Sequence, residues 1–350
     1  MGKLTLAAAL AACAAIEIAS ADAAVLVVSK SIQAAVNAAK PGDTIFVPPG
    51  TYRETVRVLK DNITILGPED AIIDASGFAN GIHVGADIFA QAPNPVCPAV
   101  AVKNFTLIGL TIQNAASNGI FLSAVDSYTL THGKYLNNGD YATYPSCSNN
   151  GQINFNYTKG GGDTCTYVGN DVEASIIGNV ATDCTVGVQV VNSDDVIIRG
   201  NNVTGNSTGI LAIVDPRNPR TETSDVLIAA NRITANNRPN TSMEGDLQSI
   251  PSGAGILIVG SDNVRIRTNE VTDNNSLGVA IFRNPLMSQD PDPNGDEVRR
   301  NLVVGNGLHA SSGLPGVDLF YDTSGSGNCF ARNKFGTSVP PNIETAFPCH

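Results

Sequence analysis

The sequence predicts an all-β protein, a right-handed parallel β-helix with coils of about 22–23 residues and one N-terminal capping helix. Three observations predict it: a motif that recurs along the chain, a second element that follows it, and an unusual composition. Of the 350 residues only 15% are charged, 34 are glycine and none is tryptophan. Such a composition suits short strands and tight turns better than long helices. We therefore expect residues 24–350 to form a single β-helix domain.

The recurring motif is a glycine followed by alternating apolar residues. It starts at Gly81, Gly119, Gly187, Gly209, Gly255, Gly278 and Gly316. In the element that follows, asparagines recur at matching places, namely Asn201, Asn231 and Asn269, and then Asn206, Asn236 and Asn274. Apolar residues with a period of two indicate strands, and a repeated strand pairs with its counterpart one coil along. Valine and isoleucine then fill the interior, and the asparagines bridge successive turns.

The N-terminal cap is predicted from the segment SIQAAVNAAKPGD. Its residues Ile32, Ala35, Val36 and Ala39 fall on one face of a helix. Pro41 and Gly42 follow and end the helix. A helix with one apolar face at this place covers the open end of the first coil.

The first residues predict export. Lys3 precedes a short apolar run, and small residues allow cleavage after Ala21 or Ala23, so we expect residues 1–23 to be a signal peptide. Alternatively, the segment LAAC resembles a bacterial lipobox, which would place a lipid anchor on Cys13. No later stretch is long and apolar enough to span a membrane. The expected location is secreted or periplasmic, and the alternative is a membrane-anchored lipoprotein.

Six cysteines remain after the signal: Cys97, Cys147, Cys165, Cys184, Cys329 and Cys349. An even number in an exported chain indicates up to three disulfides. We expect Cys329–Cys349 to clip the C-terminal tail and Cys147–Cys165 to close the loop between them. The spacing matches no zinc pattern, and no cofactor is predicted. The Asp-rich segment 289–297 could hold Ca²⁺ loosely, but it lacks the EF-hand spacing, so we interpret it as a solvated loop.

The charge of the chain limits its partners. A formal net charge of −11 argues against nucleic acid, which needs a basic face. It also disfavours a polyanion unless a cation or a local arginine cluster intervenes. We expect a monomer whose candidate partner is a polysaccharide.

Several segments carry a family resemblance. They are SIQAAVNAAKPGDTIFVPPGTY, NNGDYATYP, GILAIVDPRNP and the repeated asparagines. Over roughly residues 29–335 the chain resembles the pectin-lyase-like superfamily of right-handed parallel β-helices. It is most similar to exported bacterial parallel β-helix repeat proteins of the NosD-like and pectate-lyase-like groups, which are mostly uncharacterised. The resemblance implies the fold and leaves the activity open.

Two related activities are disfavoured. The run Gly50, Tyr52 and Glu54 resembles the N-terminal signature of pectin methylesterases, but the contexts that carry their catalytic aspartates are absent. We interpret the run as the turn that enters the first coil, with Glu54 solvated. The pair Asp194–Asp195 suggests the two carboxylates of a glycoside hydrolase. Because neighbouring turns hold Ser224–Asp225 at the same place, we interpret that pair as structural.

Residues suited to a uronate lyase or epimerase lie in four segments that depart from the repeat. Such an enzyme needs a cation for the carboxylate and groups that move the proton on the adjacent carbon. The candidates for catalysis are Lys134, Tyr141, Tyr144, Asp215, Arg217 and Arg283, and those for substrate binding are Arg220, Asp318, Tyr321 and Asp322. The competing interpretation is that these residues end strands and pack loops.

Counting from the repeat glycine brings some candidates into register. Asp215, Asn284 and Asp322 share one column, and Arg283 and Tyr321 share the column before it. A patch of carboxylate, guanidinium and phenol is therefore predicted along one edge.

An apolar stripe points away from the core. Its members are Leu211, Ile213, Leu257, Val259, Phe282 and Phe320. We expect the loops near 236–251 and 285–300 to cover it; left bare, it would be a partner or ligand surface. Two functional hypotheses follow: a carbohydrate-active lyase or epimerase acting on uronate-containing polysaccharide, or a non-catalytic envelope or extracellular binding protein.

Overall fold

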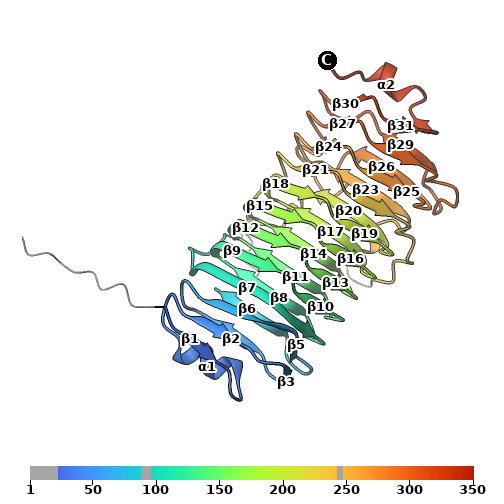
Figure 1. Ribbon diagram of the computed structural model, residues 1–350. Helices are drawn as coiled ribbons and strands as arrows, with labels where there is room; N and C mark the ends of the chain where they lie inside the picture. The colour runs from blue at the N-terminus through green and yellow to red at the C-terminus, as the bar shows by residue number, and fades with distance from the viewer. Residues whose placement is uncertain (1–22, 88–95, 243–246) are drawn as a thin grey trace, which may run out of the picture.

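A computed structural model describes residues 23–87, 96–242 and 247–350 of the chain. It shows a right-handed parallel β-helix in which strands stack coil upon coil along one axis (Figure 1). All strand pairings are parallel and fall into two sheets, one of 21 strands (sheet A) and one of 11 strands (sheet B). The all-β solenoid predicted from the repeat is confirmed.

Sheet B forms one continuous stack. Its strands are β4 (Val56–Val58), β6 (Asn80–Gly85), β8 (Asn118–Ser123), β11 (Tyr141–Ser146), β14 (Thr164–Gly169), β17 (Val186–Val191), β20 (Thr208–Ile213), β23 (Ala254–Val259), β26 (Leu277–Phe282), β29 (Val317–Tyr321) and β32 (Ser338–Val339).

Sheet A contains two stacks, which the long strands β5 (Thr64–Asp74) and β7 (Val102–Gln113) join. The first stack also has β1 (Val25–Val27), β2 (Thr44–Phe46), β9 (Val125–Thr131), β12 (Asn149–Asn154), β15 (Val172–Ile177), β18 (Asp194–Arg199), β21 (Leu227–Ala229), β24 (Arg265–Arg267), β27 (Glu297–Arg299) and β30 (Cys329–Ala331). The second also has β3 (Gly50–Tyr52), β10 (Lys134–Leu136), β13 (Tyr157–Lys159), β16 (Val180–Thr182), β19 (Asn202–Thr204), β22 (Arg232–Thr234), β25 (Glu270–Thr272), β28 (Leu302–Val304) and β31 (Lys334–Phe335).

The predicted capping helix is present as α1 (Ile32–Ala38). Ile32 and Val36 are buried against the first coil, as the helical pattern indicates. Ser31 caps the helix, and the carboxylate of Glu54 accepts hydrogen bonds from the backbone N–H groups of Ile32 (2.7 Å) and Gln33 (3.0 Å). The expectation that Glu54 is solvated was therefore wrong, because free N–H groups at a helix N-terminus favour a carboxylate. A short helix, α2 (Ile343–Ala346), covers the other end (Figure 1).

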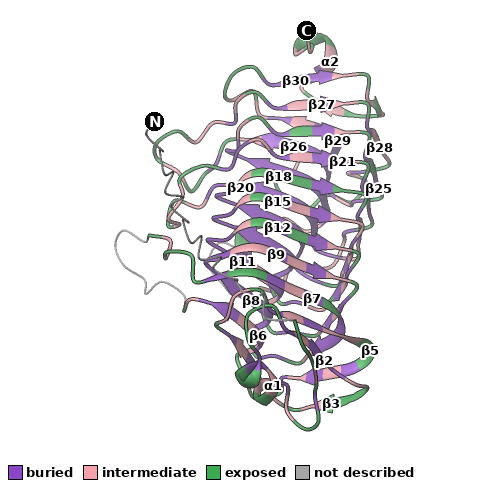
Figure 2. Ribbon diagram, turned by 60° about the vertical axis from the view of Figure 1, so that its left-hand side comes forward, coloured by how far each residue is buried: buried purple, intermediate pink, exposed green. Residues whose placement is uncertain are grey.

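Asparagine ladders hold the coils together. The backbone N–H and Nδ2 of Asn231 donate to Oδ1 of Asn269 at 2.9 and 3.0 Å, and Asn269 donates to Asn301 in the same way. A second ladder passes through Asn206, Asn236, Asn274 and Asn306. These side chains are buried and satisfy the turn backbone where the pairing of strands ends. Figure 2 shows buried residues alternating with intermediate and exposed ones along the strands of sheet A, and mainly intermediate and exposed residues at the outer turns.

The repeat glycines lie beside the second ladder. A Cβ atom on Gly255 would lie 2.5 Å from the carbonyl oxygen of Gly278 and 3.0 Å from Nδ2 of Asn274. Any larger residue would therefore collide with the next coil. Other residues replace the glycine in some coils: Ala142, Cys165 and Asp318 occupy its column.

Two expectations about register were wrong. Segment 132–145 is no departure from the repeat, since it forms β10 and β11 in regular pairing. In the last coil Gly278 is in register with Asp318 rather than with Gly316, because Leu277 pairs with Val317. Tyr321 consequently pairs with Ile281 on the inner face and does not share a column with Arg283. The insertion between β28 and β29 conceals this shift from a count along the sequence.

Three disulfides join the six described cysteines. Cys329–Cys349 is confirmed as the C-terminal clip. The expected Cys147–Cys165 bridge was wrong, because Cys147 pairs with Cys97 and Cys165 pairs with Cys184. Cys184 occupies the column of the second ladder, where its backbone N–H donates to Asn206 Oδ1 (3.0 Å). The Cys165–Cys184 bridge thus takes the place of one asparagine rung.

Disulfides are typical of proteins from oxidising compartments. The expected signal peptide and the alternative anchor on Cys13 lie in residues 1–22, outside the described residues. Within the described part of the chain, no helix is long and apolar enough to cross a membrane.

Candidate functional site

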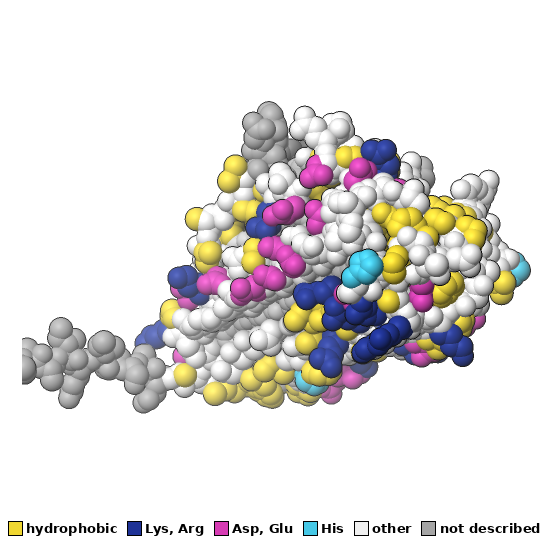
Figure 3. All heavy atoms as spheres, turned by 90° about the horizontal axis from the view of Figure 1, so that it is seen from above, with side chains coloured by type: hydrophobic (Ala, Val, Ile, Leu, Met, Phe, Trp, Pro, Cys, Tyr) yellow, Lys and Arg dark blue, Asp and Glu magenta, His cyan; other side chains and the backbone are white. Residues whose placement is uncertain are grey.

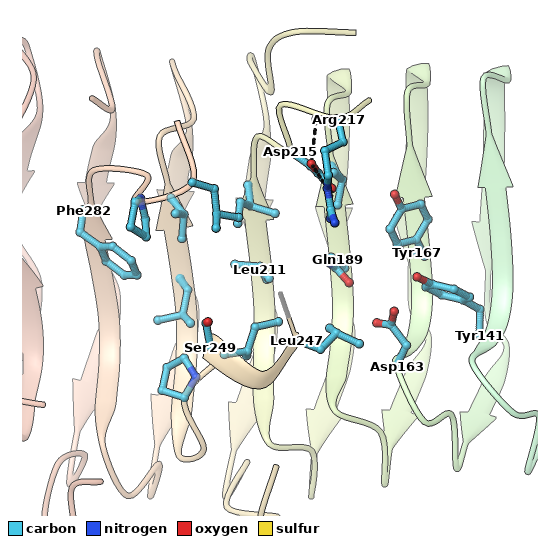
Figure 4. Close-up of a pocket in the computed structure, with 18 residues that line it drawn as sticks. Tyr141, Asp163, Tyr167, Gln189, Leu211, Asp215, Arg217, Leu247, Ser249 and Phe282 are labelled. Carbon is cyan, nitrogen blue, oxygen red and sulfur yellow. Dashed lines mark hydrogen bonds and ion pairs between the residues drawn. The ribbon is translucent and has the colours of Figure 1, made fainter. Parts of the chain in front are cut away.

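A cavity of about 450 Å³ lies on the outer face of sheet B. Its floor is one outward column of side chains, in which Tyr167, Gln189, Leu211 and Leu257 are in register on β14, β17, β20 and β23. Figure 4 shows Tyr167, Gln189 and Leu211 side by side on successive strands. A cavity of this size is in the range of small-ligand sites.

The loops between strands form the walls. Leu247, Ser249 and Ile250 come from the segment between β22 and β23, and Pro285 and Leu286 come from the segment between β26 and β27. The loops therefore cover the apolar stripe, as its composition indicated: Leu211 and Leu257 are each only 1% exposed. They cover it incompletely, and the remaining space is the cavity.

One end of the cavity is polar. It holds Tyr141, Asp163, Tyr167, Asp215 and Arg217 (Figure 4). The guanidinium of Arg217 donates from Nε to Oδ1 of Asp215 (2.9 Å) and from Nη2 to Oδ2 (2.7 Å). Such a two-point contact fixes the orientation of both groups. The hydrogen bond to Asp215 also raises the pKa of Arg217 above its usual value.

Three tyrosines pack together at this end. The ring of Tyr141 stacks on Tyr144 with centroids 4.4 Å apart, and Tyr167 meets Tyr141 edge-on at 5.1 Å. Burial, and next the charge of Asp163, raise the pKa of Tyr141 well above its usual value and that of Tyr144 to about 12. Burial likewise raises the pKa of Tyr167. At neutral pH these phenols are protonated and can donate a proton.

Asp163 lies between the tyrosines and the floor. Its carboxylate accepts a hydrogen bond from the hydroxyl of Thr164 (2.7 Å), whose oxygen also lies within hydrogen-bonding distance of Gln189 Oε1. Asp163 and Leu247 also border a second hollow of about 270 Å³, where Arg238 lies. The Nε of Arg238 is 3.4 Å from Asp183 and its side chain is 34% exposed. Asp163 therefore borders both hollows, and an arginine lines each of them.

The structure brings together only some of the candidate residues from the sequence. Tyr141, Asp215 and Arg217 line the cavity, and Tyr144 supports Tyr141 from the adjacent position. Lys134 lies in sheet A, where it pairs with Glu69. Arg220 belongs to the loop behind the cavity wall, where its backbone binds Asn170 and Asn192.

The C-terminal candidates lie apart from the polar end. The backbone N–H of Arg283 donates to Asp322 (2.8 Å), and its Nε faces Asp292 at 3.4 Å. Asp318 is buried and ends the second ladder by accepting from the backbone N–H of Asn306 (2.9 Å). Tyr321 is buried against Phe330. The predicted column of Arg283 and Tyr321 therefore does not form a site.

Asp163, Tyr167 and Gln189 did not emerge from the sequence. Asp163 and Tyr167 belong to the coil in which Cys165 replaces the repeat glycine, so the glycine motif that marks other coils is missing there. The spacing of the repeat glycines could have revealed this coil, because the 68 residues that separate Gly119 from Gly187 are enough for three coils. Among the described residues, no group of three or more His, Cys, Asp or Glu side chains is arranged to hold a metal ion.

Comparisons with known proteins agree with the fold. The family model described as "Right handed beta helix region" matches residues 100–335. The fold is similar to the A-module of the Azotobacter vinelandii mannuronan C-5 epimerase AlgE4, with a TM-score of 0.60 and 16% identity over 87% of this chain and 92% of that one. It is also similar to the DFA-IIIase of Arthrobacter chlorophenolicus A6, with a TM-score of 0.58 and 16% identity over 84% of this chain and 74% of that one. No curated protein matches the sequence. Identities this low show a shared fold alone.

Proposed function

Since this chain belongs to the right-handed β-helix family, in which a site on the outside of the coil must carry the function, we propose that it is a carbohydrate-active enzyme. The proposed substrate is a polysaccharide that contains uronate, and the proposed reaction is epimerisation or β-elimination at the carbon next to the carboxylate. The reaction would take place at the polar end of the cavity over sheet B.

One observation carries the proposal. The cavity surrounds a single space with a carboxylate (Asp163), a neutral phenol (Tyr141) and a carboxylate-held guanidinium (Asp215–Arg217). The three groups come from β11, the turn before β14 and the loop after β20, so only the stacked coils bring them together. A proton acceptor, a proton donor and a cation are what proton transfer next to a carboxylate requires.

Each group has a defined task. The guanidinium of Arg217 faces the substrate carboxylate and stabilises the negative charge that develops when the adjacent carbon loses its proton. Asp163 accepts that proton. Tyr141, which stays protonated at neutral pH, supplies the proton that the carbon takes up in epimerisation. In β-elimination it instead protonates the leaving glycosidic oxygen, and a carbon–carbon double bond remains in the sugar.

The similar structures support a carbohydrate as substrate. One is named as a mannuronan epimerase and the other as a DFA-IIIase, which has also been solved in complex with DFA-III. Arg217 and Arg238, which line the two hollows that Asp163 borders, favour a substrate with carboxylates over a neutral sugar.

The test uses purified protein and a panel of uronate polysaccharides. Proton exchange with deuterated water, followed by NMR, detects epimerisation, and ultraviolet absorbance detects the unsaturated product of elimination. We expect one of the two signals, and we expect Tyr141→Phe to lower the rate by about 10²-fold. Tyr144→Phe is the matched control, because Tyr144 lies in the same aromatic cluster outside the cavity lining. Absence of both signals across the panel would refute the proposal.

A second candidate is sugar binding without catalysis. It is favoured by the contact that holds Nε and Nη2 of Arg217 on Asp215 and by the apolar floor of Leu211 and Leu257. Polysaccharide binding with neither proton exchange nor elimination, weakened by Arg217→Ala, would establish this function instead.

A further inference from the structure

A second surface, on the opposite sheet, carries a concentration of positive charge. Six side chains of sheet A and its turns form what we call the basic ridge. Arg199, Arg267 and Arg299 end strands, Arg300 and Arg332 lie in the turns that follow strands, and Lys334 begins β31. Figure 3 shows a dense group of Lys and Arg side chains on the C-terminal half of the molecule, apart from the main group of Asp and Glu. The chain as a whole has a formal charge of −11, so the charge of the ridge is opposite in sign to the net charge of the protein.

The register between successive coils brings the residues of the ridge close together. Arg199, Ala229, Arg267, Arg299 and Ala331 occupy one outward column on β18, β21, β24, β27 and β30. Adjacent members of a column are about 4.8 Å apart at the backbone. The next position along the strand lies in the turn, where Arg300 and Arg332 both have positive φ, 57° and 58°. The backbone N–H of Arg300 donates to Ala331, which places these two arginines on neighbouring coils.

Few carboxylates balance the ridge. Glu297 contacts two of its members, Arg267 at 2.9 Å and Arg299 at 3.3 Å. Among the described residues, no ion pair joins the side chains of Arg199, Arg300, Arg332 or Lys334 to an acidic group, and all four residues are exposed. Like charges on neighbouring strands repel each other. Four of the six cations of the ridge are therefore exposed to solvent without a counter-charge among the described residues.

We propose that the basic ridge is a second, non-catalytic binding site for a carboxylate-bearing polysaccharide. Guanidinium groups bind carboxylates through paired hydrogen bonds. The cations lie on four of five successive coils along the helix axis, which suits a linear polymer with repeated charges better than a compact anion. The choice of a uronate polymer rests on the proposed function of the cavity. The site itself is independent of that cavity, which lies over the other sheet.

The experiment measures binding without turnover. Protein with Arg217→Ala is titrated with polygalacturonate and with alginate at several salt concentrations. The double variant Arg300→Gln and Arg332→Gln removes two ridge cations that have no ion pair within the described residues, so the fold should tolerate it. Lys103→Gln with Lys159→Gln is the matched control, because both lysines are exposed and lie away from the ridge. We expect the ridge variant to weaken binding about tenfold at low salt and the control to change it little.

The outcomes separate the two proposals. Tenfold weaker binding in the ridge variant, with unchanged turnover of short uronate oligosaccharides when Arg217 is restored, supports the ridge. Equal binding by the ridge variant and its control overturns it, and the cavity proposal stands. Binding to anionic lipid vesicles or duplex DNA, with none to either polysaccharide, also overturns it. Ridge-dependent binding without turnover of any oligosaccharide supports the ridge and contradicts the catalytic proposal.

Discussion

The outer faces of the two sheets have the same repeat and different surroundings. On sheet B, Leu211 and Leu257 point outward and are each 1% exposed under the loops. On sheet A, Ile197 points outward from β18 and is 40% exposed. The strands on both faces pair in register from coil to coil, so the difference does not arise in the strands.

The difference arises in where the chain tolerates insertions. Between β18 and β19, and at the same corner of later coils, the turn is a residue with positive φ followed by a buried asparagine, as in Gly200 and Asn201. The asparagine ladder fixes this corner, so no loop can grow there. Long segments follow β20 and β26 and precede β23 and β29 instead. Sheet B consequently acquires walls and a cavity, while sheet A stays bare and displays its charges.

The largest expected effect is a loss of catalytic activity that distinguishes the outer face of sheet B from that of sheet A. Asp163→Asn removes the carboxylate in the cavity and should lower kcat about 10³-fold, because the proton acceptor is lost. Asp195→Asn, on the outer face of sheet A, is the control; its φ of 54° suits asparagine equally well. Turnover by both variants is measured on the same uronate substrate. Comparable losses in the two variants would contradict a site confined to sheet B.

The next effect concerns the corner that joins the faces. Asp171 lies between β14 and β15 and is fully buried, and burial raises its pKa to about 8. The unfolded chain therefore loses this proton at lower pH than the folded one, so the free energy of unfolding falls as pH rises from about 4 to about 8. Asp171→Ser should remove this decline and increase stability by about 3 kcal/mol near the upper end of that range.

Serine suits this corner, since Ser148 and Ser193 occupy it in the neighbouring coils and make the same backbone contact. Urea unfolding at several pH values measures the effect. A decline that persists in the variant would show that Asp171 is not its source.

A third effect tests the cover over sheet B. Leu257→Asn places an amide among apolar loop and strand residues and should lower the free energy of unfolding by about 2 kcal/mol. Ile197→Asn changes an outward residue of the bare face and should lower it by about 0.5 kcal/mol. Thermal unfolding of the two variants gives the comparison. Equal losses would mean that the loops over sheet B contribute little to stability.

The smallest effect concerns the basic ridge. Arg300→Asn removes one of two neighbouring cations and places a residue that favours positive φ at a position with φ of 57°. Stability should rise by about 0.5 kcal/mol at low salt, and part of the gain should vanish at high salt. A loss of stability would show that Arg300 has a favourable contact in the folded protein.

The sequence by itself determined the β-helix, its capping helix and its ladders. Each of these depends on a pattern that repeats at one coil length: Val and Ile inside, Gly at the close approach, Asn at the corner. The bridge Cys329–Cys349 was also predicted, as a clip on the C-terminal tail. The apolar stripe and its covering loops were predictable because alternation gives the direction of each side chain and a bare apolar row is unfavourable in water.

Only the tertiary structure decided which residues meet. Asp163 and Tyr167 lie in a coil without its glycine, and Asp318 ends a ladder because an insertion shifts the last register by two residues. Arg267 and Arg300 look like ordinary strand and turn residues in the sequence and form a ridge only when coils stack. The physical reason is the same in each case. Stacking converts a separation of about 22–23 residues, or more across an insertion, into a neighbour about 4.8 Å away. Composition and motifs show which residues each coil contains, and the register between coils determines which residues become neighbours.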